Sequence, residues 1–293
     1  MRLKSYQADG ILLLVAISWG VTFALVQDAI EQIPVYTFLF WRFGFAFVLM
    51  AIVAWKHWHK LNMPTLYAAI VLGLLNFSAF AFQTYGLTLT LSSTVAFITG
   101  LNVIFIPFLA LLLSRRSVSR YAMIGAMIAV AGLWFLTGQE GIGMGLGEIY
   151  TLVCAVLFSL HILYTDRFVR VHDVTLLVTI QFGVIALASL LTGITVDGSV
   201  IPSSYSDAFL LALISTVVFA TVFAFWAQTS MQRFTTPAKT ALIFTMEPLS
   251  AAVFGYLYAG EVLSPLQMLG GGLMIVGVLY AELMTLRRAP TPL

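Results

Sequence analysis

The sequence has 293 residues, of which 61% are hydrophobic and 9% charged, and its formal net charge is +2. Soluble domains carry about 25% charged residues, so a chain of this composition lacks the polar surface that a soluble protein needs. The small net charge gives no reason to expect a nucleic-acid partner, and the single cysteine, Cys154, excludes an internal disulfide and a thiolate metal cluster. We therefore expect a membrane protein without a metal or other cofactor.

Ten apolar runs follow one another along the chain. A hydrocarbon core of about 30 Å requires roughly 20 residues of helix, and each run approaches that length. The first run follows two basic residues, as in a signal peptide, but it is long enough to span and no small-residue cleavage site follows it. We interpret it as the first of ten transmembrane helices, at approximately 10–27, 35–55, 66–86, 92–113, 120–137, 148–165, 174–194, 208–228, 238–258 and 265–286.

The basic residues provide an independent test of this count. Of the 14 Lys and Arg residues, all except Arg42 fall at the two ends of the chain or in every second loop. The positive-inside rule places these segments in the cytoplasm. The sequence thus predicts an all-α polytopic protein with both termini cytoplasmic, and the loops on the other side carry acids: Asp28, Glu31, Glu140, Glu148, Asp197, Asp207 and Glu261.

The two halves of the chain share a pattern. Pro107 in the run 92–113 aligns with Pro248 in the run 238–258, and pairs of glycines follow both. This order indicates a duplication, with a first five-helix repeat at 1–137 and a second at 138–293. Because five is odd, the second repeat must start on the opposite side of the membrane, so the repeat is inverted. Inverted repeats are typical of secondary transporters with a substrate site between the halves.

The runs 120–137 and 265–286 carry the paired glycines, Gly125 with Gly132 and Gly270 with Gly277. Small residues at this spacing allow helices to approach closely in lipid. One interpretation is a dimer interface, so that the protein is a monomer or a weak homodimer through these two runs. The interpretation that we favour is packing of each run onto its own half.

Several runs place polar and aromatic side chains on one helical face in apolar surroundings. Polar groups are costly in lipid, so these faces should turn toward the protein interior or a water-filled cavity. Simple hydrogen bonding or packing between helices is the alternative for each of them. The candidate substrate-binding residues are Trp19, Asn76, Phe80, Gln83, Thr99, Asn102, Phe244 and Glu247.

Two charges within the runs have competing interpretations. Arg42 could pair with a substrate carboxylate, but we favour a structural pairing with Asp28 or Glu31, or an outward-reaching side chain. Glu247 lies near the middle of its run and is a candidate proton-coupling group. The favoured alternative for Glu247 is that it satisfies hydrogen-bond donors freed where Pro248 breaks the helix.

A series of short motifs runs along the chain in a fixed order: Ser18-Trp19-Gly20, Trp41-Arg42-Phe43, Glu247-Pro248, Gly260-Glu261 and the segment from Gln267 to Gly277. Their order and spacing resemble the drug/metabolite transporter superfamily, specifically its ten-helix EamA-type exporters, over essentially the whole chain. The first half departs from the family pattern, with Ile106 where Glu is common and Arg115-Arg116 where Gly-Glu is common.

Within that superfamily the chain is similar to bacterial exporters of aromatic and other neutral amino acids. This resemblance implies an inner-membrane protein with a central cavity formed by both halves and with small metabolites as substrates. It implies outward transport by alternating access, with Pro107 and Pro248 as candidate hinges.

Three other functions would require different sets of charged or catalytic residues. A proton-coupled exporter of cationic or amphiphilic drugs needs an acidic residue within the membrane, and Glu247 is the acidic residue that lies deep within a run. A phosphate-binding exchanger needs several basic groups in its cavity, and within the runs there is only Arg42, with Lys239 at an inner end. An enzyme needs a cluster of catalytic or metal-binding groups, and none of the 4 histidines pairs with a carboxylate at such a spacing within a run.

Overall fold

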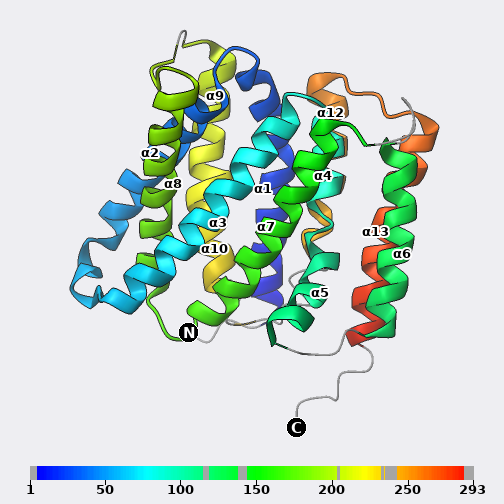
Figure 1. Ribbon diagram of the computed structural model, residues 1–293, viewed down its shortest axis with the longest axis horizontal. Helices are drawn as coiled ribbons and strands as arrows, with labels where there is room; N and C mark the ends of the chain where they lie inside the picture. Colours follow the sequence, from blue (N-terminus) through cyan, green and yellow to red (C-terminus); the bar gives the residue numbers. More distant parts are fainter. Residues whose placement is uncertain are drawn as a thin grey trace.

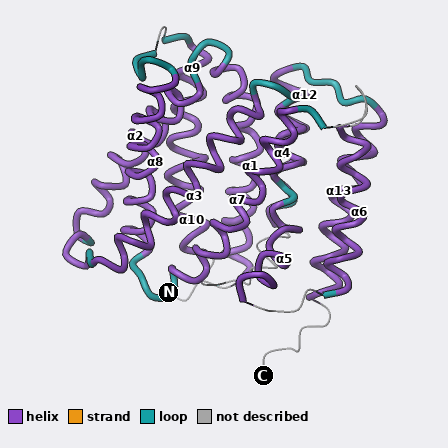
Figure 2. The backbone as a smooth tube through the Cα atoms, viewed as in Figure 1, coloured by secondary structure: helices purple, strands orange, loops and turns teal. Residues whose placement is uncertain are grey.

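The computed structural model describes residues 5–114, 119–137, 144–202, 205–231, 234 and 243–286. The described residues form helices and no strand, and Figures 1 and 2 show these helices side by side with the loops gathered at the two ends of the bundle. The start of α1 and the end of α13 lie at the same end (Figure 1). The all-helical class predicted from the sequence is confirmed, whereas the cytoplasmic placement of both termini stays a prediction.

The helices of the first half are α1 (Ser5–Ile30), α2 (Val35–Val53), α3 (Met63–Leu87), α4 (Ser92–Thr99), α5 (Asn102–Ser114) and α6 (Arg120–Thr137). Two short 3-10 turns, η1 (Ala54–Lys56) and η2 (Trp58–Lys60), connect α2 to α3. The second half contains α7 (Leu146–Phe168), α8 (Val174–Val196), α9 (Asp207–Ser215), the π-helical segment η4 (Thr216–Phe223), α10 (Ala224–Met231), α12 (Met246–Ala259) and α13 (Pro265–Leu286).

Seven helical stretches of the described chain are long and apolar enough to cross a membrane. They are Gln7–Ile30, Val35–Lys56, Met63–Leu87, Ser92–Leu113, Leu146–Phe168, Val174–Val196 and Asp207–Met231. Two shorter apolar stretches, Met123–Leu136 and Pro265–Ala281, lie within α6 and α13. These findings indicate a multi-pass membrane protein, and the count of ten spans remains a prediction. Arg115-Arg116, Glu140 and Lys239 of the sequence argument lie outside the described residues.

The helix starts follow from local side-chain hydrogen bonds. The Asn62 side chain accepts from the Thr65 N–H at the start of α3, and the Ser206 hydroxyl accepts from the Phe209 N–H at the start of α9. Such N-caps satisfy backbone donors that the first helical turn leaves unpaired. At its other end, α12 stops at Gly260, whose φ of +66° is left-handed and favours glycine.

Both candidate hinge prolines lie downstream of a helix break rather than at it. The run predicted at 92–113 is divided at Gly100 and Leu101, between α4 and α5, and Pro107 lies inside α5. Pro248 lies in the first turn of α12, where a missing N–H removes no intrahelical bond. Gly100 and Pro248 are close, since a Cβ on Gly100 would lie 3.5 Å from Pro248 Cγ. The roles of Pro107 and Pro248 as hinges stay predictions, and the helix break of the first of these runs lies at Gly100–Leu101.

The two halves of the chain interleave. Helix α1 packs against α12 and against the α9–η4–α10 stretch, and α7 correspondingly packs against α4, α5 and α3. Helix α2 packs against α8, and α6 packs against α13 (Figure 1). Helices at equivalent places in the two halves thus have equivalent partners, and most of these partners belong to the other half.

The α6–α13 pair corrects the prediction that each glycine-bearing helix packs onto its own half. A Cβ on Gly132 would lie 2.6 Å from the Gly270 carbonyl oxygen, and one on Gly277 would lie 2.6 Å from the Gly125 carbonyl oxygen. Small residues let the two backbones approach in this way. The contact is intramolecular and joins the two halves. A dimer through these helices would therefore have to use their other faces.

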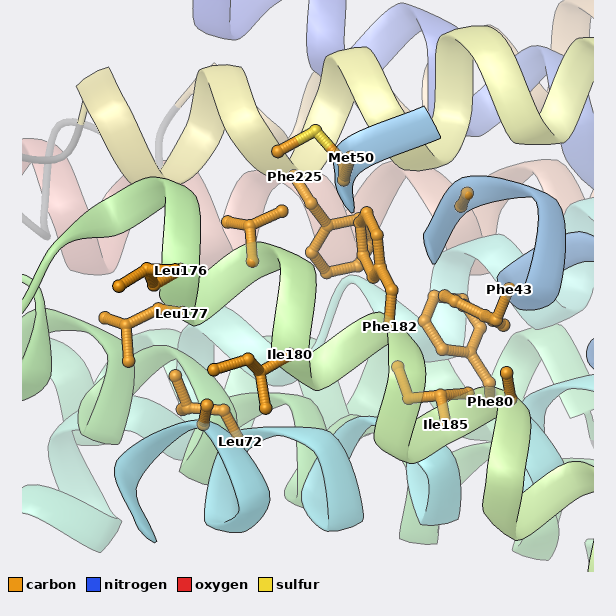
Figure 3. Packing of buried hydrophobic residues seen from close by; sticks show 14 of the residues in the cluster. Phe43, Met50, Leu72, Phe80, Leu176, Leu177, Ile180, Phe182, Ile185 and Phe225 are labelled. Carbon is orange, nitrogen blue, oxygen red and sulfur yellow. The ribbon is translucent and has the colours of Figure 1, made fainter. Parts of the chain in front are cut away.

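The largest buried cluster lies between α2, α3 and α8. Phe43, Phe80, Phe182 and Phe225 pack against one another in it, and the ring centroids of Phe43 and Phe80 are 5.0 Å apart (Figure 3). Phe80 and Phe225 continue from this cluster toward the centre of the bundle, so the core supports the aromatic side chains described below.

Polar contacts connect the two halves of the chain at each end of the bundle. At the end where α2 joins α3, Asp173 accepts from His57 Nδ1 at 2.9 Å and from Lys60 Nζ at 3.0 Å, and it caps α8. Partial burial alone would raise the pKa of Asp173, but the hydrogen bonds from His57 and Lys60 outweigh it and lower the pKa to about 2. At the other end, Glu261 accepts from the backbone N–H and hydroxyl groups of Ser92 and Ser93, at 2.5–3.2 Å. Both contacts join one half of the chain to the other.

Candidate functional site

A cavity of about 60 Å³ lies among helices of both halves. One water needs about 10–15 Å³ on this measure, so the space corresponds to about four to six waters or one small solute. Its walls come from α1, α2, α3, α4, α5, α7, α10 and α12 together with Phe244, which directly precedes the turn into α12. The lining residues are Trp19, Thr22, Phe23, Val26, Arg42, Phe80, Gln83, Thr84, Leu87, Thr99, Asn102, Phe158, His161, Ile162, Phe225, Gln228, Phe244 and Glu247.

The structure brings most of the sequence-predicted residues to this cavity. The candidates that line it are Trp19, Arg42, Phe80, Gln83, Thr99, Asn102, Phe244 and Glu247. Asn76 is the exception, since it is fully buried in α3 away from the cavity. Neither atom of its side-chain amide has a hydrogen-bond partner among the described residues. Asn76 and Gln83 are two helical turns apart on α3, but only Gln83 reaches the cavity.

Aromatic rings form one wall. The Trp19 ring centroid lies 5.2 Å from that of Phe244 and 5.7 Å from that of Phe225. Phe225 continues to Phe80 at 6.0 Å, and Phe80 packs edge-on against Phe158 at 5.2 Å. The indole N–H of Trp19 donates to the Ala220 carbonyl at 2.9 Å, so only the ring of Trp19 is available to a solute. This wall suits the apolar part of an amphiphilic molecule.

Polar groups gather at the break between α4 and α5. Gln83 Nε2 donates to the hydroxyl of Thr99, the last residue of α4, at 3.3 Å. Asn102 begins α5, and its backbone carbonyl accepts from the Ser159 hydroxyl at 2.9 Å. Transporters often place an interrupted helix at the substrate site because unpaired backbone groups there can be turned toward a cavity. Thr99 and Asn102, on the two sides of the Gly100–Leu101 break, thus line the cavity together with Gln83 of α3.

Arg42 enters the cavity from α2, and the structure does not show the pairing with Asp28 or Glu31 that the sequence favoured. Its side chain points into the bundle, where Arg42 Nε donates to Thr221 Oγ1 at 2.9 Å and the guanidinium carbon lies 4.7 Å from the Phe80 ring centroid. Asp28 instead accepts from the Tyr258 hydroxyl at 3.1 Å. The reason for the correction is that Arg42 lies on the buried face of α2.

Glu247 lies in the first turn of α12, where the positive end of the helix dipole favours an acid. Its backbone comes close to α1 at Gly20, and its backbone carbonyl accepts from the Ser250 hydroxyl at 2.9 Å. Among the described residues its carboxylate has neither an ion pair nor a hydrogen bond. The bonds to donors freed by Pro248, which the sequence favoured, are therefore absent from this part of the chain.

Sequence reasoning missed several lining residues. Gln228 carried a usable signal, because an amide inside an apolar run is costly unless it faces a cavity or a partner. His161 lines the cavity while its Nε2 contacts Gln181 Oε1 at 3.2 Å. Phe158 and Phe225 carried no signal, because a phenylalanine in an apolar run looks the same whether it faces lipid, core or cavity.

The described chain is thus a bundle of apolar helices with interleaved halves and a cavity between them. A model of the EamA-like transporter family matches the chain twice, at residues 7–138 and at residues 145–282. The chain belongs to the EamA-like transporter family. As an EamA-like transporter it is a multi-pass membrane protein of a family of transporters.

Two relatives of this EamA-like transporter are themselves named only as transporters. An uncharacterized transporter of Archaeoglobus fulgidus is 28% identical over 281 residues, covering 96% of this chain and 87% of that protein. The uncharacterized transporter YyaM of Bacillus subtilis is 25% identical over 281 residues, covering 90% of this chain and 89% of that protein. A solved crystal structure has a TM-score of 0.71 at 19% identity, covering 97% of this chain and 99% of the other. That similarity shows the fold alone.

Proposed function

We propose that this EamA-like transporter exports small neutral metabolites, above all aromatic and other neutral amino acids, across the bacterial inner membrane by alternating access. The observation that carries the proposal is the composition of the cavity. It holds one guanidinium and one carboxylate, from Arg42 and Glu247, beside a wall of aromatic rings. A solute with one charge of each sign and an apolar side chain is complementary to such a lining.

The charges support this proposal further because each lacks an opposite charge of its own. The ion pairs formed by the described residues involve neither Arg42 nor Glu247. Charged groups within a membrane protein are rare and mark substrate or ion pathways. An amino acid supplies the missing partners, since its carboxylate can meet the guanidinium and its ammonium can meet the carboxylate.

The second candidate is a proton-coupled exporter of cationic or amphiphilic drugs, which Glu247 favours. Arg42 counts against it, because a cation in the same cavity would be repelled by the guanidinium at low local dielectric. The absence of further lining Lys and Arg residues from the described part counts against phosphate compounds. The zwitterionic solute is therefore the first to test.

Uptake of labelled phenylalanine and threonine into proteoliposomes tests the proposal, with protein-free liposomes as the control. Equilibration above background without any ion gradient would support a facilitated amino-acid carrier. Accumulation that requires an imposed proton gradient would support amino-acid transport coupled through Glu247. If neither amino acid enters under either condition while a cationic dye is accumulated with the proton gradient, the amino-acid proposal is wrong and the drug exporter replaces it.

A further inference from the structure

The π-helical segment η4 breaks the regular hydrogen bonding of its transmembrane stretch beside the cavity. In an α-helix the N–H of Ala224 would bond to the Ala220 carbonyl, four residues earlier. Here the Ala224 N–H bonds to the carbonyls of Phe219 and Thr221 instead. The Ala220 carbonyl is thereby available to a side chain, and it accepts the indole N–H of Trp19. Short π-helical insertions in α-helices are frequent at functional sites.

The next residue of the same segment contacts the second cavity residue. Thr221 is fully buried, and its hydroxyl oxygen accepts from Arg42 Nε at 2.9 Å. Consecutive residues of η4 thus hold the Trp19 ring and the Arg42 guanidinium, one through a carbonyl and the other through a hydroxyl. Trp19 comes from α1 and Arg42 from α2, so η4 sets their relative positions.

The contacts of Arg42 leave the two Nη atoms of its guanidinium without a hydrogen-bond acceptor among the described residues. Nε is bonded to Thr221, and the guanidinium carbon lies 4.7 Å from the Phe80 ring centroid and 5.1 Å from the Phe43 ring centroid. Arg42 lines the cavity, so a solute in the cavity can reach the guanidinium. Two parallel N–H donors fit a carboxylate in bidentate geometry.

We propose that Arg42 is the subsite for the carboxylate of the transported solute, and that Thr221 is the positioning residue that aims it. This inference rests on the proposed function, because it names the part of a neutral amino acid that the cavity recognises. Thr221 fixes the guanidinium through Nε, so both Nη atoms stay directed to the carboxylate. The aromatic side chain of the solute lies along the Trp19 wall, which η4 holds in register with Arg42.

A substitution series separates positioning from general structural damage. Thr221→Val keeps the size of the side chain and removes the acceptor, and Thr221→Ser restores it. Thr216→Val is the matched control, because Thr216 is buried in the same segment but bonds to the Ala212 and Leu213 carbonyls of its own helix. It does not line the cavity.

Binding is measured first, with purified full-length protein and three probes of one shape: phenylalanine, 3-phenylpropionate without the ammonium, and phenethylamine without the carboxylate. Thermal-shift titration gives a Kd for each probe. We expect Thr221→Val to weaken phenylalanine and 3-phenylpropionate roughly tenfold, since a buried hydrogen bond to a charged group is lost, and to leave phenethylamine within about twofold. Thr221→Ser and Thr216→Val should resemble the wild type.

The two proposals fail in different ways. If the wild-type protein binds 3-phenylpropionate no better than phenethylamine, or if Thr221→Val weakens all three probes equally, the carboxylate subsite is wrong whatever the protein transports. The same holds if Thr216→Val reproduces the effect of Thr221→Val. If the carboxylate preference and its loss in Thr221→Val are found but labelled phenylalanine does not enter proteoliposomes, the subsite stands and amino-acid transport is wrong.

Discussion

Substituting Gly20 by alanine should destabilise the contact between α1 and α12 beside the cavity. Gly20 lies where α1 meets α12, and an added Cβ would contact the Ser250 side chain and the Glu247 carbonyl and would lie 2.8 Å from the Ala251 nitrogen. Two of these atoms belong to the α12 backbone and cannot rotate away. The two helices would therefore have to separate, moving Trp19 and Glu247 with them.

The size of the effect follows from the cost of overpacking, which is about 1–3 kcal/mol. With a melting temperature that moves by about 2–4 °C per kcal/mol, Gly20→Ala should lower it by about 2–12 °C. Gly10 is the control in the same helix, because a Cβ there would meet no atom within 4 Å. Gly10→Ala should leave the melting temperature unchanged or raise it by no more than about 4 °C, because alanine adds at most about 1 kcal/mol of helix propensity.

Both variants are compared in detergent by thermal denaturation followed by size exclusion, and then by phenylalanine uptake at equal amounts of folded protein. Uptake by Gly20→Ala should fall even when corrected for folded protein, because Trp19 and Glu247 adjoin the strained contact. A Gly20→Ala protein that melts as high as Gly10→Ala would refute the close approach of α1 and α12.

Three further predictions concern buried and capping polar groups. Asn76→Leu should raise the melting temperature by at least about 2 °C and leave uptake unchanged, because it removes an amide that is buried without a partner; reduced uptake would show that Asn76 serves transport. Glu261→Gln should lower stability by about 1–3 kcal/mol, because the amide accepts fewer bonds from Ser92 and its neighbour and no longer opposes the helix dipole; an unchanged melting curve would contradict the cap. The pKa of Asp173 is depressed, so its contribution is present above about pH 4 and lost as the pH falls toward 2. The difference in melting temperature between wild type and Asp173→Asn should therefore be present at pH 5 and shrink below pH 4.

The family could be predicted from the order of short motifs along the chain, and the helical class because the lipid solvent acts on each run separately. A run of apolar residues has to be helical in hydrocarbon, whatever its partners are. That Trp19, Gln83 and Glu247 line a cavity could be predicted for a related reason. Polar and amphipathic groups within such runs are costly in lipid, so they face the protein interior or a cavity. These predictions needed no knowledge of which helix packs against which.

The remaining features depend on partners, and the sequence could not supply them. Helix α3 is apolar on nearly every side, so its pattern does not show which way Asn76 turns. The sequence also does not show that the helix is interrupted at Gly100–Leu101 and continues through Pro107, because a glycine and a proline inside an apolar run are both tolerated where neighbouring helices satisfy the backbone. The π-helical segment around Ala220 has no sequence pattern of its own. Its role becomes visible only in the hydrogen bond from the Trp19 indole N–H to the Ala220 carbonyl.

The repeat explains why the two charges matter. Arg42-Phe43-Gly44 occupies the same place in α2 as Gln181-Phe182-Gly183 does in α8, since each triplet begins seven residues after the first residue of its helix. The Phe43 and Phe182 ring centroids are 5.8 Å apart, so the equivalent phenylalanines of the two halves meet in the core.

The residues before those phenylalanines differ, because one copy has a guanidinium bonded to Thr221 and the other an amide bonded to His161. Glu247 likewise stands opposite Ile106 when the two repeat prolines are aligned. A two-fold scaffold with identical halves would offer the same group at both ends of its cavity, whereas a zwitterion has unlike ends. To bind such a solute, the two copies of the duplicated scaffold therefore have to differ in the residues that line the cavity. Arg42 and Glu247 are two cavity positions at which the copies differ.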